Sequence, residues 1–162
     1  MSLKLTDEDV QDLIDLAKEL IEKNQLELPL DNSTSFKSIK GSIKIKHYSS
    51  TEYEFSLDYF LRPNKTILNF RELKYNYCLL RLNLNENFHK NSNGQRIHGN
   101  RINFYSVNEY SNKADQKTYM KCYQLPYKQF KNTTDIDTQL TTLLNYTNTD
   151  FRDKLDIISV LT

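Results

Sequence analysis

Apolar and polar residues alternate over much of residues 39–84, and this alternation constrains the fold more than any other feature. Successive side chains of a strand point to opposite faces, so a period of two indicates strands with one buried face. The clearest run is 75–84, in which Leu80, Leu82 and Leu84 share a face. Short connections between such runs favour antiparallel pairing. With further strand-like runs after residue 100, the sequence predicts an antiparallel sheet of five to seven strands.

A helical period stands at the N-terminal end of the chain. Thr6 is typical of an N-cap, with Asp9 three residues later, and apolar residues then recur every three or four positions as far as Ile21. This pattern predicts one long amphipathic helix over residues 7–23, with its acidic side chains on the outer face. A short extended piece is expected in the polar connector 24–38.

Two further amphipathic segments follow the predicted sheet. Thr134 is expected to cap a helix, and Asp150 opens a last apolar-periodic segment. Together with the sheet, these segments predict an α+β fold with one long N-terminal helix and one or two C-terminal helices. A length of 162 residues fits a single domain over residues 1–162.

Charge is divided unevenly along a chain whose formal net charge is only +1. The first 31 residues hold nine acidic residues and three lysines, and a positive excess lies between Arg62 and Lys131. The N-terminus lacks the apolar region of a signal peptide, and no run approaches the roughly 18–20 apolar residues of a membrane span. We therefore expect a cytoplasmic protein that does not enter a membrane.

Familiar catalytic and cofactor motifs are missing from the sequence. It contains no Walker loop, no GxGxxG, no GxSxG and no HExxH, and its three glycines make backbone cradling of a nucleotide improbable. Cys78 and Cys122 lie far apart in strand-like stretches without metal-ligand spacing, so two reduced, partly buried thiols are expected. The sequence predicts no cofactor and no metal.

Residues 85–100 form a polar, Asn-rich loop that gathers basic side chains. Metal-independent RNA cleavage needs an acid, a base and a cation for the phosphorane, and histidine, arginine and lysine supply these roles. In that interpretation His89 and His98 are the acid/base pair, and Arg96 and Arg101 bind phosphate. The plainer interpretation is that both histidines are solvated loop residues.

The predicted sheet is basic and rich in tyrosine, which suits single-stranded nucleic acid. Cations would follow the phosphate backbone while rings stack on bases. The candidate binding residues are Arg81, Lys90, Arg96, Arg101, Tyr105 and Lys121. Two alternatives stay open: an ordinary wet sheet face carrying Tyr/Lys pairs, and a basic face covered by the acidic helix.

The run YCLLRLNLN at 77–85, followed by His89, the Asn93-Gly94 turn and INFY at 102–105, resembles a family of small uncharacterised bacterial and phage-associated proteins. That family combines an N-terminal amphipathic helix, an LLRLDIN-like strand, an H-x-N-x-[D/N]-G turn and an HLHIY-like strand. The resemblance implies no established activity. This sequence also differs from the family pattern, because Arg101 and Asn103 stand where the family has later histidines.

Three functions follow as hypotheses. The first is a non-enzymatic binding module, linked to a phage or mobile element, that engages a protein partner or single-stranded nucleic acid through the basic sheet and the 85–100 loop. The second is a small metal-independent ribonuclease of toxin type. The third is an inhibitory protein whose acidic N-terminal helix mimics nucleic-acid charge. The sequence leaves the oligomeric state and the identity of any partner open.

Overall fold

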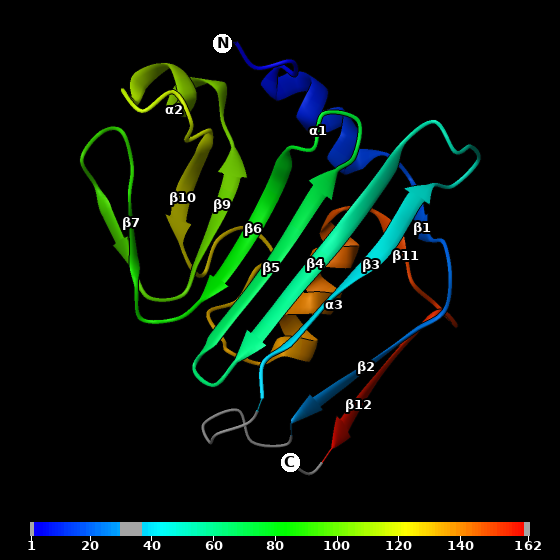
Figure 1. Cartoon of the computed structure of the whole chain (residues 1–162). Coiled ribbons are helices and arrows are strands. Elements are labelled where there is room, and N and C mark those ends of the chain that lie inside the picture. The colour runs from blue at the N-terminus through cyan, green and yellow to red at the C-terminus, as the bar shows by residue number, and fades with distance from the viewer. Residues whose placement is uncertain (1, 30–36, 161–162) are drawn as a thin grey trace.

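The structure is a computed structural model that describes residues 2–29 and 37–160 (Figure 1). It is mostly β-sheet, with 44% of the described residues in strands and 17% in helices. The expected α+β fold with a long N-terminal helix is therefore wrong. The three helices of the described residues are short: α1 (Asp7–Asp15), α2 (Val107–Asn112) and α3 (Ile136–Tyr146).

The main sheet has eight strands, more than the five to seven expected. In spatial order they are β10 (Met120–Gln124), β9 (Arg101–Tyr105), β6 (Cys78–Leu84), β5 (Lys65–Glu72), β4 (Glu54–Arg62), β3 (Ile39–His47), β1 (Lys18–Leu20) and β11 (Thr149–Asp150). The run β3–β4–β5–β6 is an antiparallel meander, as the alternation predicted. Only the β1–β11 pair of this sheet is parallel.

Two small ribbons complete the strands. In the first, β2 (Asn24–Pro29) pairs in parallel with β12 (Leu155–Val160), and Figure 1 shows this ribbon at the lower right, below the main sheet. In the second, β7 (Phe88–Lys90) and β8 (Arg96–His98) form an antiparallel hairpin at the opposite edge, beside β10. The expected 85–100 loop is thus largely a β-hairpin. The short extended piece expected in the 24–38 connector is β2, and residues 30–36 lie outside the described part.

The helix predicted over 7–23 ends eight residues early. Its start is as expected, since Thr6 and Asp9 form a reciprocal capping box. Leu16 then leaves the helical conformation at ψ 134°, and Lys18 enters β1 between β3 and β11. Ile21, which the helical period placed on the buried face, is 42% exposed. The helical spacing of apolar residues therefore predicts the structure correctly only up to Asp15. Beyond it, pairing of β1 with the sheet outweighs the local helical pattern.

The C-terminal segment is a second correction. One helix after Pro126 was found as α3, capped by Asp135 rather than Thr134. The segment after Asp150 is not a helix: it forms β12 against β2. Three of its residues, Ile157, Ile158 and Val160, are β-branched and suit a strand, and the pairing with β2 decides the element. α2 lies in the connection between β9 and β10.

The main sheet has one covered face and one open face. Leu57, Leu68 and Leu82 point to the covered face and belong to the core, which also contains Val10 and Ile14 of α1 and the apolar side of α3. Phe55 and Phe70 stack in this core with ring centroids 5.3 Å apart. Figure 1 shows α3 behind the sheet, whereas no helix lies over the middle of the face toward the viewer. That face is called the open face below.

Candidate functional site

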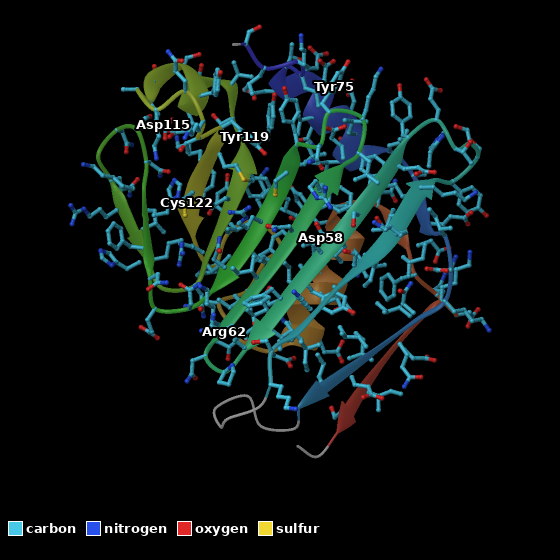
Figure 2. All side chains as sticks on the ribbon, viewed as in Figure 1. Asp58, Arg62, Tyr75, Asp115, Tyr119 and Cys122 are labelled. Carbon is cyan, nitrogen blue, oxygen red and sulfur yellow. The ribbon has the colours of Figure 1, made fainter. Side chains whose placement is uncertain are left out.

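The centre of the open face is a hydrogen-bonded row of polar side chains around Asp58. Asp58 lies on β4 and accepts from Ser42 Oγ and Ser56 Oγ, each at 2.7 Å, and from Arg71 Nε at 2.9 Å. Burial favours the neutral carboxyl, but these hydrogen bonds and the Arg71 charge outweigh it and lower the pKa of Asp58. Figure 2 shows Asp58 over the middle of the sheet. The positive charge of Arg71 is therefore balanced by the Asp58 carboxylate.

Most cations on the open face form no ion pair with a described carboxylate. Lys46 pairs with Glu19, and Arg71 pairs with Asp58. The remaining cations of this face form no ion pair with any described residue: Lys40, Lys44, Arg62, Lys65 and Arg81. Phe60 and Ile67, opposite each other on β4 and β5, add a half-buried apolar spot between them. The open face thus carries surplus positive charge.

The β7–β8 hairpin is held firmly against the end of the sheet. Its turn contains Gly94 at φ 88°, a conformation that glycine adopts without strain. The buried Asn91 side chain bonds both backbone groups of Cys122 on β10, donating to the carbonyl and accepting from the N–H at 2.9 Å each. Glu109 of α2, only 4% exposed, accepts from Ser92 N and Ser92 Oγ. These contacts fix which face of the hairpin meets solvent.

The outer face of the hairpin carries an exposed aromatic and basic cluster. Cross-strand pairing puts Phe88 opposite His98 and Lys90 opposite Arg96, and all four side chains are exposed. The Phe88 ring is 49% exposed, with the Arg96 guanidinium carbon 5.2 Å and the His98 ring 5.4 Å from its centroid. We call these four residues the hairpin patch. Three of them were predicted from the sequence; Phe88 was missed, although a lone aromatic residue in a polar loop was a usable signal.

The inner face of the hairpin holds His89 near the arginines of the sheet. His89 pairs with Ile97, which is buried. Burial lowers the pKa of His89, the charges of Lys113 and Arg101 lower it further, and Glu109 opposes them. Arg101 is 7% exposed and its Nη1 donates to Asn85 Oδ1, Asn87 O and Gly99 O, which ties both ends of the hairpin to β9. Arg101 therefore acts in packing the hairpin.

The two candidate catalytic histidines lie on opposite faces of the hairpin. Residues 89 and 98 are out of phase in the pairing, so His89 faces the sheet and His98 faces solvent. An acid/base pair must reach the same substrate atoms. The structure does not bring these two side chains together.

The other candidate residues are dispersed. Arg81 lies half-buried on the open face and donates to Asn69 Oδ1 at 2.6 Å. Tyr105 is buried, donates its hydroxyl to Leu5 O at 2.7 Å, and has a raised pKa caused chiefly by burial. Lys121 points to the covered face, above the Tyr123 ring. The tyrosines expected on the basic face lie largely elsewhere.

The cysteines are free thiols and both are buried, as expected. Burial raises the pKa of Cys122 to about 11, so this thiol stays protonated at neutral pH. Figure 2 shows Cys122 on β10. Within residues 2–29 and 37–160, no group of three or more His, Cys, Asp or Glu side chains could hold a metal ion. None of the helices in that part is long and apolar enough to cross a bilayer.

Comparison with known proteins places the chain in a family. The model described as "Family of unknown function (DUF6978)" matches residues 5–149, so the chain belongs to that family. No curated protein and no solved structure matches it. The expected membership in an uncharacterised family is confirmed at this level.

Proposed function

We propose that this member of the family of unknown function is a non-enzymatic module that binds single-stranded nucleic acid. The hairpin patch would supply the Phe88 ring as a platform for a base, with Lys90, Arg96 and His98 close to the phosphates. The unpaired cations of the open face would extend the path of the backbone. The single observation that supports this proposal best is the exposed Phe88 ring flanked by a guanidinium 5.2 Å away.

A binding role accounts for the geometry better than catalysis does. Stacking on an aromatic ring stabilises a bound base by about 1–3 kcal/mol and accepts any base, because every base has a π-face. The ribonuclease alternative needs His89 and His98 on one substrate, and they lie on opposite faces of the hairpin. The charge-mimic alternative requires a long acidic helix, but Glu19 lies on β1 and its carboxylate pairs with Lys46 at 3.4 Å.

The setting is part of the proposal. The sequence resemblance implied a phage or mobile-element context, and the cytoplasm is the compartment that we propose with it. In that setting we propose transient single strands, of RNA or DNA, as the ligand.

Phe88→Ala tests the stacking role directly. Fluorescence anisotropy with a labelled 12-nucleotide oligouridine should show a roughly tenfold weaker affinity, within the range expected for one lost stacked base. Phe88→Tyr should retain most of the affinity because it keeps the ring. Arg96→Gln and Lys90→Gln should each reduce the slope of log affinity against log salt by about 0.7.

Lys131→Gln is the matched control, because Lys131 is also an exposed lysine but follows Phe130, which packs in the core beside α3. It should leave both affinity and slope unchanged. Equal loss in Lys131→Gln and Arg96→Gln would mean a diffuse charge effect. An affinity that is the same in Phe88→Ala and the unaltered protein would end the proposal.

A further inference from the structure

A cleft separate from the hairpin patch lies between α1 and the turns that connect β3 to β4 and β5 to β6. Its volume is about 830 Å³. Asp12 and Leu13 line it from α1, Glu52 and Tyr53 from the first turn, and Tyr75 from the second. Figure 2 shows Tyr75 at the end of the sheet that lies near α1. We call it the α1 cleft.

The charge of the α1 cleft is opposite to that of the open face. Five carboxylates line it, from Asp9, Asp12, Glu52, Glu54 and Glu72, against two lysines, Lys4 and Lys74. Glu72 is buried and satisfied by the backbone N–H groups of Lys74, Tyr75 and Tyr77. Asp12, Glu52 and Glu54 are exposed and form no ion pair with any described residue. These three carboxylates are available to an outside cation.

Aromatic rings flank these carboxylates, and the remainder of the lining is partly apolar. Tyr53 and Tyr75 are 36% and 39% exposed, which places them among the most exposed large rings of the described chain. Leu5 and Leu13 contribute apolar surface to the same cleft. The chain's own Lys74 already lies with its Nζ 5.4 Å from the Tyr75 ring centroid, so the site accepts an ammonium group over that ring.

We infer that the α1 cleft binds an extended Lys- or Arg-rich peptide segment of a protein partner. The aliphatic stem of a Lys or Arg side chain would pack on Leu5 and Leu13, as such stems do on apolar surfaces. Its charged head would meet Asp12, Glu52 and Glu54 and lie against the Tyr53 or Tyr75 ring. This occupant follows from charge complementarity together with the rings. It goes beyond nucleic-acid binding, because the surface, its charge and the ligand class all differ.

The test titrates the full chain with a fluorescent nine-residue peptide in which Arg alternates with Ser. Anisotropy at low salt should show saturable binding that weakens as salt rises. The double variant D12N/E52Q should weaken binding about tenfold, and Tyr75→Leu about threefold, as expected for losing one cation–π contact. Glu8→Gln is the matched control, because Glu8 is an exposed carboxylate of the same helix that does not line the cleft.

Three outcomes would overturn the inference. Equal weakening by Glu8→Gln and the double variant would show an effect of net charge alone. Equal affinity for a peptide with Leu in place of Arg would indicate an apolar occupant. Unchanged affinity in Tyr75→Leu and the double variant would exclude the cleft. None of these results bears on Phe88, so the two binding proposals fail or stand separately.

Discussion

At the scale of single residues, Lys18 is a buried lysine that contacts two helix ends and the sheet. It is 1% exposed, and its Nζ donates to Ile14 O, Leu16 O and Thr147 O at 2.8, 2.7 and 2.6 Å. These carbonyls belong to the ends of α1 and α3, whose terminal C=O groups lack partners within the helix. The same Nζ lies 5.0 Å from the Phe55 ring centroid. One ammonium group thus joins both helix ends to the sheet.

Burial also makes Lys18 sensitive to pH. It lowers the pKa of Lys18 from 10.5 to about 7, although the Asp15 charge opposes this shift. Between these two values the unfolded chain binds more protons than the folded one, so the contribution of Lys18 makes stability rise with pH. We expect the free energy of unfolding to increase by about 1.5 kcal/mol from pH 7 to pH 8.5 relative to Lys18→Met.

Urea denaturation at both pH values measures this difference. Lys18→Met should itself be less stable at pH 7 by about 2–4 kcal/mol, because it removes the Lys18 hydrogen bonds to Ile14 O, Leu16 O and Thr147 O at the ends of the two helices. The cysteine thiols of the unfolded chain, with an ordinary pKa of about 8.5, ionise within the same range, and the comparison with Lys18→Met cancels their contribution. Parallel pH dependence of the two proteins would contradict the role given to Lys18.

At the scale of elements, the β7–β8 hairpin depends on side-chain contacts with β10 and α2. Asn91→Ala removes both hydrogen bonds to Cys122 and leaves a buried N–H and C=O unpaired. We expect a loss of about 1–3 kcal/mol in the free energy of unfolding. Hydrogen exchange should become faster at residues 88–98, while the β4–β5 amides keep their protection.

The matched control for the hairpin is Asn93→Ala, since Asn93 lies in the same turn, is exposed and only accepts from Gln95 N. It should change stability far less than Asn91→Ala. Uniform acceleration of exchange over the whole sheet in Asn91→Ala would mean that the hairpin does not open as a separate unit.

These elements also show where sequence reasoning succeeds. The strands β3 to β6 were predictable because one face is buried and the other is exposed to solvent. Apolar and polar residues therefore alternate along these strands. Three of the four hairpin-patch residues were found because they gather in one basic stretch. The faces of His89 and His98 were not predictable, because they depend on the pairing register of a hairpin only three residues long on each side.

The errors have a common physical cause at the two ends of the chain. Residues 16–21 and 155–160 carry apolar residues at spacings that suit a helix, but the first stretch contains β1 and the second forms β12. Each finds its partner far along the chain: Lys18 pairs with Thr149, and Leu155 with Asn24. The spacing of apolar residues within a short segment carries no information about a pairing partner more than 100 residues away. Tertiary contacts therefore determine whether the segment is a helix or a strand.

At the scale of the whole molecule, the β2–β12 ribbon and the β7–β8 hairpin lie at opposite ends (Figure 1). A chain ending at Asp153 would lack β12 and uncover Leu26 and Leu28, which are 3% and 6% exposed. We expect its free energy of unfolding to fall by about 2–4 kcal/mol. Its affinity for the oligouridine should stay the same, because the hairpin contacts do not involve the ribbon.

Denaturant titration and anisotropy of this shortened chain measure both effects. The full chain carrying Asp156→Asn is the control, since it keeps the ribbon and should match the unaltered protein in each assay. A parallel loss of stability and nucleic-acid affinity in the shortened chain would show that the two ends are coupled.

The alternation within the β7–β8 hairpin separates two kinds of constraint on adjacent residues. Positions 89, 91 and 97 must fit the β9–β10 edge, whereas the side chains at positions 88, 90, 96 and 98 are exposed. Ligand preference could therefore be redesigned on the solvent side by exchanging four side chains, with no need to repack the interior. The exposed side chains of the hairpin can thus vary while the residues that pack it against β9 and β10 stay the same.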